Sequence, residues 1–145
     1  MNHGEKIAYL AGIIDGEGSI MLWMNKGDPK IRGQFNLRIN VSSTTKCLID
    51  WLTDNFGGNS YELNAPSRKA HPHWKQQYIW EVKKPDLLPF MKQIHPYLLI
   101  KKSHCEIAIK FRETFAKRER RISQETYDKR LNLYEQMKHL NLRGR

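Results

Sequence analysis

The most regular pattern in the chain is an alternation of polar and apolar side chains over residues 34–42. The polar positions carry amide, guanidinium and hydroxyl groups, and they are Gln34, Asn36, Arg38, Asn40 and Ser42. Because successive side chains of a strand point to opposite faces, the alternation predicts a strand with one dry and one wet face. Amide side chains suit the edge of adenine and a guanidinium suits guanine, and β-ribbons fit the major groove. The wet face therefore has the chemistry to read base edges.

The length of this segment also fits a duplex. Nine residues, 34–42, at about 3.3 Å each span about 30 Å, and DNA advances about 3.4 Å per base pair along each strand. One such strand could therefore follow about nine base pairs. The same surface would be extended by Trp23, Asn25, Asn64, Lys75, Gln77 and Glu81. A polar strand face is also often merely solvated, and that alternative stays open.

The charge of the chain favours a polyanionic partner. Its 145 residues hold 25 Lys and Arg against 15 Asp and Glu, a formal net charge of +10 at pH 7. Residues 1–60 are balanced, so residues 61–145 carry the whole excess. A basic region of this kind attracts nucleic acid or simply keeps a protein soluble. The charge alone does not decide between the two.

Size and composition predict one globular domain over residues 1–145. Cys47 and Cys105 lie far apart and lack metal-binding spacing, which favours a reduced protein. No apolar run approaches the roughly 18 residues of a membrane span, and the N-terminus lacks the form of a signal peptide. We therefore expect an intracellular protein with no membrane partner, in a compartment that the sequence does not reveal.

Apolar side chains at helical spacing predict a short helix over about residues 5–15, which ends in Asp-Gly-Glu-Gly. Its buried stripe would be Ile7, Leu10, Ala11 and Ile14. Another face carries Ala8, Gly12 and Gly16 at four-residue spacing. Small residues so arranged let two helix backbones approach closely, and a glycine inside a helix costs about 1 kcal/mol against alanine. Gly12 therefore needs a packing reason, either inside the chain or between two chains.

The remaining sequence predicts further strands and helices. We expect strands at about 19–26, 34–42, 59–64 and 74–83, and helices at about 44–56, 85–94, 102–115 and from 123 onward. Ser43 or Thr44 would cap the helix that ends at Gly57. Core candidates are Trp51, Trp74, Tyr78, Trp80, Val82, Leu87, Phe90, Met91, Ile94, Ile107, Ala108, Phe111, Phe115, Tyr127, Leu131, Tyr134 and Met137. Ile79 is expected to face outward.

The segment Leu10-Ala11-Gly12-Ile13-Ile14-Asp15-Gly16-Glu17-Gly18 resembles the nine-residue signature of the LAGLIDADG homing endonucleases almost position by position. The predicted α-β-β-α-β-β-α order extends this resemblance over residues 5–115 by architecture. It implies an α+β fold, the αββαββα saddle, in which an antiparallel sheet carries helices on one face. The motif helix would lie at about 5–18 and a C-terminal helical region at about 102–145.

The resemblance also implies a homodimer. In this family two motif helices pack together and bring the acidic residue at the eighth position, here Glu17, beside its counterpart. This chain has one such motif, so cutting two DNA strands would need two chains with a two-fold interface through Ala8, Gly12 and Gly16. Adjacent carboxylates stay ionised only around cations, and hard oxygen ligands suit Mg²⁺.

In the family, the backbone carbonyl at the position of Gly16 also binds the metal. The implied activity is therefore Mg²⁺-dependent hydrolysis of DNA phosphodiesters, giving a double-strand break at a long pseudo-palindromic site, as in intron homing. A family lysine that precedes the fourth helix supports the active-site water network, and Lys101 matches it. Ser43 and Cys47 stand where the family often has glutamine and arginine, and Lys46 is a candidate substitute.

Two alternatives remain on the same residues. One is an RNA-binding maturase that assists intron splicing on the same fold, since such proteins can retain an intact acidic residue. The other is a DNA-binding module that does not cleave, which loss of the acid would favour and Glu17 disfavours. Splicing and cleavage assays separate the three.

Overall fold

The computed structural model describes residues 1–25, 34–63, 73–116 and 118–143. In chain order its elements are α1 (His3–Glu17), β1 (Gly18–Asn25), β2 (Gln34–Ser43), α2 (Lys46–Phe56), β3 (Asn59–Glu62), β4 (Tyr78–Glu81), the 3-10 helix η1 (Lys84–Asp86), α4 (Leu87–Ile94), the 3-10 helix η2 (His95–Tyr97), α5 (Lys102–Glu113) and α6 (Gln124–Arg143). Within these residues, no helix is long and apolar enough to cross a membrane.

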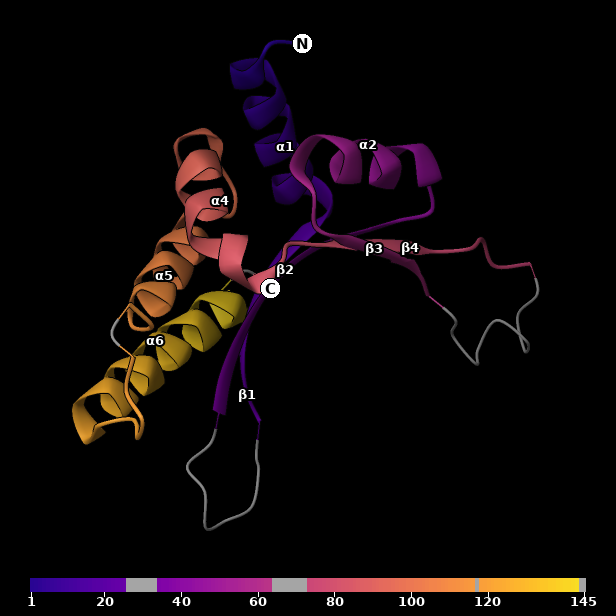
Figure 1. Ribbon diagram of the computed structural model, residues 1–145. Coiled ribbons are helices and arrows are strands. Elements are labelled where there is room, and N and C mark those ends of the chain that lie inside the picture. The colour runs from indigo at the N-terminus through magenta and orange to yellow at the C-terminus, as the bar shows by residue number, and fades with distance from the viewer. Residues whose placement is uncertain (26–33, 64–72, 117, 144–145) are drawn as a thin grey trace.

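The four strands form one antiparallel sheet in the order β1-β2-β4-β3. β1 pairs with β2 from Gly18↔Val41 to Asn25↔Gln34, whereas β4 pairs only with the last part of β2, from Asn40↔Glu81 onward. The β1–β2 hairpin and the β3–β4 pair consequently extend in different directions from the middle of the sheet (Figure 1). The helices pack on one side of this curved sheet, which confirms the predicted α+β architecture.

The alternating pattern of β2 is confirmed. Phe35, Leu37, Ile39 and Val41 are buried against the helices, and the polar residues between them are exposed or half-buried. On β1, Ile20 and Leu22 are buried on the same side. The apolar face of the sheet therefore forms the core, and the polar face points away from it.

Helix α1 carries the predicted stripe, since Ile7, Leu10, Ala11 and Ile14 are all buried. It begins at His3, before the predicted start, and ends at Glu17. Asn2 caps it: the Asn2 side chain accepts from the backbone N–H of Glu5 at 2.9 Å, and the Glu5 carboxylate accepts from Asn2 N at 3.2 Å.

The C-terminal end of α1 continues directly into β1. A Cβ at Gly18 would lie 2.7 Å from the Cα of Ile14. The chain therefore needs a glycine there to turn from the helix into the strand, and this turn places Glu17 where helix and sheet meet.

Three predictions about the core were wrong. Trp74 is 51% exposed, because β4 begins only at Tyr78: β2 ends at Ser43, so residues 74–77 have no β2 segment to pair with. Ile79, expected to face outward, is buried; it pairs with Ser42 and Tyr61 on the polar face but outside the main core. Phe115 is 39% exposed, because α5 ends at Glu113.

Helix α6 is attached to the fold by aromatic and cation–π contacts. Ser123 caps it by accepting from Thr126 N at 3.2 Å. Tyr127 and Tyr134 stack on Phe35 with ring centroids 5.7 and 5.8 Å apart. Arg130, which the sequence analysis did not identify, is buried with its guanidinium 3.8 Å from the Phe115 ring, and its Nε donates to the Thr114 hydroxyl.

Gly58 gives a stability prediction. Its φ is +83°, and a Cβ there would lie 2.5 Å from Glu81 O and 2.8 Å from Nε1 of Trp80. We expect Gly58→Ala to lower the free energy of unfolding by about 2–4 kcal/mol, from backbone strain plus a clash with the sheet. Gly57 also has a positive φ, +68°, but open space around it, so Gly57→Ala should cost only about 1–2 kcal/mol. Urea titration of both variants tests the difference, and equal losses would contradict the clash.

Candidate active site

The end of α1 presents one acidic side chain to solvent. Glu17 is the last residue of the helix and is exposed, and Gly16 before it is exposed too. Among the described residues, no hydrogen bond or ion pair involves the Glu17 carboxylate. The last carbonyls of a helix have no partner within that helix, so this turn offers a free carboxylate and backbone oxygen atoms together. Such groups are hard oxygen ligands.

Lys101 lies at the same turn of α1. Its ammonium donates to the backbone oxygen of Asp15 at 2.7 Å, and its backbone N–H donates to the Asp15 carboxylate at 2.9 Å. A cation at the C-terminal end of a helix is also stabilised by the helix dipole. Lys101 is thus held by Asp15, which precedes Glu17 by two residues on α1.

Asp15 is a residue of this site that the sequence analysis did not single out. Its carboxylate accepts hydrogen bonds from the backbone N–H groups of Leu99, Ile100 and Lys101. Partial burial raises the pKa of Asp15, but these hydrogen bonds and the positive charge of Lys101 outweigh it and leave the pKa below its ordinary value. The carboxylate is thus stabilised in its charged form.

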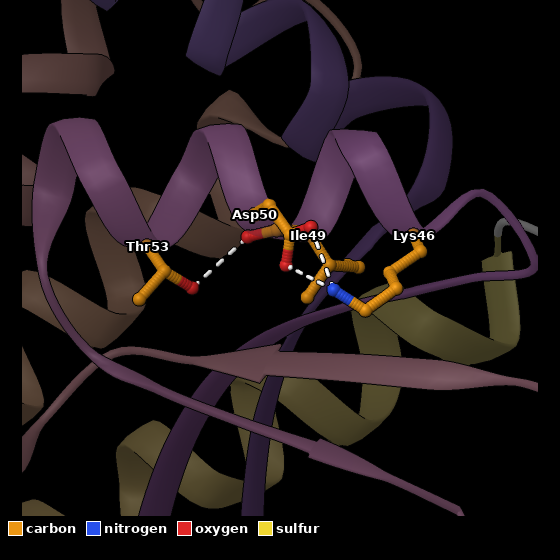
Figure 2. A network of polar contacts seen from close by, with 4 residues as sticks. All are labelled: Lys46, Ile49, Asp50 and Thr53. Atoms are coloured by element: carbon orange, nitrogen blue, oxygen red, sulfur yellow. Dashed lines mark hydrogen bonds and ion pairs between the residues drawn. The ribbon is translucent and has the colours of Figure 1, made fainter.

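Among the described residues, no hydrogen bond or ion pair joins Lys46 or Ser43 to Glu17. Lys46 lies in the first turn of α2 and pairs with Asp50 at 2.8 Å; in the same helix Thr53 Oγ1 donates to Ile49 O (Figure 2). The hydrogen bond to Asp50 and its charge raise the pKa of Lys46.

Ser43 and Cys47 flank the start of the same helix. Ser43 Oγ accepts from Thr45 N at 3.0 Å, which orders the turn into α2, although the N-cap is Thr45 rather than the predicted Ser43 or Thr44. Cys47 is exposed on α2. The roles predicted for Ser43 and Lys46 in catalysis stay predictions.

The outer face of α1 is open within this chain. Ala8, Gly12 and Gly16 are exposed, and a Cβ built at Gly12 or Gly16 would meet nothing within 4 Å. Within the part of the chain that the structure describes, these glycines therefore make room for no other segment, which leaves packing between two chains as the predicted reason for Gly12. Tyr9, next to this face, is half exposed and stacks edge-on against Trp51 at 5.1 Å.

The polar face of the sheet collects most of the residues predicted to contact DNA. The pairings Trp23↔Asn36 and Met21↔Arg38 place side chains of β1 and β2 on one face, and Asn40↔Glu81 adds β4. Residues exposed or half-buried on or beside this face are Trp23, Asn25, Gln34, Asn36, Arg38, Asn40, Ser42, Lys75, Gln77 and Glu81. Asn64 lies outside the described residues.

The same face contains polar atoms that lack partners. The guanidinium of Arg38 lies 5.6 Å from the Trp23 ring, and Trp23 Nε1 donates to Asn25 at 3.1 Å. Arg38 Nε and Asn36 Nδ2 are buried without a hydrogen-bond partner among the described residues. Buried donors are rarely left unpaired, so these two side chains keep hydrogen-bonding capacity that an external acceptor could use once they shift toward it.

β3 adds two residues to this face that the sequence analysis missed. Asn59 pairs with Glu81 and Tyr61 pairs with Ile79, so both point to the polar side, and both are exposed. The four-residue strand is too short for its alternation to be recognised from the sequence alone. The polar face thus extends across all four strands.

The described part of the chain holds no group of three or more His, Cys, Asp or Glu side chains that could enclose a metal ion. Glu17 and the Gly16 carbonyl supply hard oxygen donors suited to Mg²⁺. They fit one side of a magnesium site, and the remaining oxygen donors would have to come from water, from a bound phosphate or from a second chain.

No family model and no curated protein sequence matches the chain, but solved structures do. The homing endonuclease I-CvuI, in complex with its target, superposes with a TM-score of 0.76 at 16% identity, over 94% of this chain and 82% of that chain. The archaeal intron-encoded homing endonuclease I-Vdi141I, complexed with DNA, gives a TM-score of 0.74 at 13% identity, over 93% of this chain and 83% of its own.

A longer protein of this kind matches over part of its length. The LAGLIDADG homing endonuclease I-SmaMI, bound to cleaved DNA, gives a TM-score of 0.65 at 21% identity, and the match covers 88% of this chain but only 42% of that one. The superpositions and the four-stranded antiparallel sheet with its helices agree on one α+β fold. The chain has the fold of the LAGLIDADG homing endonucleases.

Proposed function

We propose that this chain is a site-specific DNA endonuclease that acts as a homodimer and makes a double-strand break by Mg²⁺-dependent hydrolysis. The observation that carries the proposal is the end of α1, where the Glu17 carboxylate has no partner among the described residues and the outer face of the helix is uncovered by them at Gly12 and Gly16. A second copy packed on that face would bring a second Glu17 to the first. The whole chain would form one such endonuclease domain.

Two further observations support the dimer. The loop before α5 exposes two apolar side chains, Leu99 at 88% and Ile100 at 71%, and Asp15 fixes this loop to the end of α1. Exposed apolar surface of this kind marks contact with another molecule. In addition, the match covers less than half of I-SmaMI, so the longer protein has room for two such units where this chain has one.

The polar face of the sheet supports DNA as the substrate. It offers amide and guanidinium donors over four strands, and two of those donors are buried without a partner among the described residues. I-CvuI and I-Vdi141I are both described in complexes with DNA. The net charge of +10 adds attraction for phosphates that does not depend on sequence. Because I-Vdi141I is intron-encoded, intron homing is part of the proposal.

The proposed chemistry divides between residues of both copies. Glu17 and the Gly16 carbonyl would hold Mg²⁺, which when bound activates a water and stabilises the displaced phosphodiester oxygens. The Lys101 ammonium, held on Asp15 O, offsets negative charge that develops on the phosphate. The sheet face binds and orients the duplex, so that the scissile phosphates lie at the ends of the two α1 helices.

Incubation of the purified protein with a randomised DNA library, with and without Mg²⁺, tests this function. We expect cleavage at one family of pseudo-palindromic sites in the presence of Mg²⁺, and none after the metal is chelated. Binding to a selected duplex without any cleavage would identify a non-cleaving module instead. Promotion of intron splicing without DNA cleavage would identify a maturase.

Arg38 gives a prediction about specificity. We expect Arg38→Ala to relax base preference at one position in each half-site, at a cost of about 1–3 kcal/mol for the preferred base, because a guanidinium pairs with guanine through two hydrogen bonds. Arg121, exposed in the turn between α5 and α6, is the matched control, and Arg121→Ala should leave base preference unchanged. Binding to a set of single-base variants of the site measures both. A uniform loss of affinity over all sequences would assign Arg38 to phosphate.

A further inference from the structure

The contact between α1 and the start of α5 joins residues 84 to 86 positions apart in the chain. The two oxygens of Asp15 accept from Leu99 N at 2.8 Å, from Ile100 N at 3.2 Å and from Lys101 N at 2.9 Å. The Lys101 ammonium returns to the backbone oxygen of the same aspartate at 2.7 Å. Four hydrogen bonds thus connect one residue of the motif to one short loop.

The three N–H groups belong to the N-cap residue of α5, Lys101, and to the two residues before it, Leu99 and Ile100. Lys101 is the N-cap of α5, and its own side chain makes no capping hydrogen bond. The first N–H groups of a helix have no partner within it, and the positive end of its dipole favours an anion. The Asp15 carboxylate accepts from the N-cap N–H of Lys101 and from the two N–H groups before it, and it places a negative charge at this helix end, so it caps the start of α5 from a different helix.

The consequence for Lys101 is that it is held at two points. Its backbone is fixed by the aspartate carboxylate and its ammonium by the aspartate carbonyl. A flexible lysine side chain loses considerable rotamer freedom when it is fixed, and here the protein has already restricted that freedom before any substrate arrives. The ammonium is kept at the turn of α1 that ends in Glu17.

We propose that Asp15 is a positioning residue, which by capping the start of α5 holds the Lys101 ammonium in place for the reaction. This inference rests on the proposed function, because Lys101 matters for cleavage only in an endonuclease. It assigns different tasks to the two acids of the nine-residue motif: Glu17 for the metal and Asp15 for the loop.

The experiment compares Asp15→Asn with a control variant, Asp50→Asn. In the native protein Asp50 pairs with Lys46 on the surface of α2. Asparagine keeps one acceptor oxygen but loses the charge and replaces the second acceptor by a donor. We expect the amides of Leu99, Ile100 and Lys101 to exchange with deuterium about tenfold faster or more in Asp15→Asn, because their acceptor is weakened. The control should show wild-type exchange in this loop.

The kinetic arm measures single-turnover cleavage and the Kd for the target DNA. We expect Asp15→Asn to slow cleavage by about 10- to 100-fold, as expected for a displaced catalytic group, with a Kd within about threefold of wild type. The decisive comparison is in a Lys101→Met background, where adding Asp15→Asn should slow cleavage no further. A merely structural role would lower the rate in both backgrounds.

The outcomes separate the inference from the function that it rests on. If the wild-type protein cuts no DNA, the proposed function fails and the kinetic half of the inference falls with it, while amide exchange still tests the cap. Two results would overturn the inference alone when the wild-type protein cuts DNA. In the first, Asp15→Asn cuts as fast as wild type. In the second, Asp15→Asn slows cleavage by the same factor in the Lys101→Met background as in the wild-type background. Asp15→Glu, which keeps the charge but lengthens the side chain, replaces Asp15→Asn if that variant does not fold, and the same loss of rate and protection is expected.

Discussion

Glu17→Gln is expected to abolish DNA cleavage while the protein still dimerises and binds its target. Glutamine has nearly the same shape, so the end of α1 and its contacts should persist. It lacks the negative charge that a divalent cation requires from its ligand. We expect the single-turnover rate to fall by about 10³-fold or more, which corresponds to about 4 kcal/mol of lost transition-state stabilisation. Binding measured without Mg²⁺ should change little.

The matched control lies at the other end of the same helix. Glu5→Gln makes the same chemical change in the first turn of α1, where the side chain accepts from Asn2 N and glutamine can still do so. This variant should cleave at the wild-type rate. Equal cleavage by Glu17→Gln and wild type would remove Glu17 from the mechanism. Loss of both binding and cleavage would show that Glu17 is needed for assembly rather than for chemistry.

The parts of the fold that follow from local periodicity were predicted from the sequence. The stripe Ile7, Leu10, Ala11 and Ile14 and the alternation of β2 each report burial on one face, and each is confirmed. The spacing of apolar residues along the chain predicts which face of an element is buried, and this spacing can be recognised without knowing what the element packs against. The nine-residue motif supplied the rest of the architecture by resemblance.

Features that depend on distant partners could not be predicted. Asp15 is notable only because it meets the N–H groups of Leu99, Ile100 and Lys101, and no local pattern marks a carboxylate that caps another helix. Trp74 has the alternation expected of a strand, but β2 ends before it could pair with that segment.

The burial of Arg130 on α6 also depends on residues distant in the sequence and could not be predicted. It is buried because Phe115 and Thr114 at the end of α5 receive its guanidinium. An arginine is almost never fully buried unless it is paired. The sequence therefore favours an exposed position, and only the packing of α6 on α5 reverses that expectation.

Gly12→Leu is expected to dissociate the dimer and at the same time leave the single chain at least as stable as before. Inside the chain the substitution is favourable, because a Cβ at Gly12 meets no described residue within 4 Å and leucine gains about 1 kcal/mol over glycine in a helix. Between two chains it is unfavourable, because each copy adds a large side chain where the helix backbones approach.

These opposite effects follow from one claim, that the open face of α1 is covered by another α1. Overpacking costs about 1–3 kcal/mol for each copy, and a two-fold interface contains the residue twice, so dimerisation should weaken by about 30-fold or more. Sedimentation velocity over a range of protein concentrations measures this, and urea unfolding measures the stability of the chain. Asp54→Leu, which also adds an exposed leucine but on α2, is the control and should dimerise normally. A Gly12→Leu protein that remains dimeric and cuts DNA would place the interface elsewhere, and the two Glu17 carboxylates could then no longer be assumed to meet.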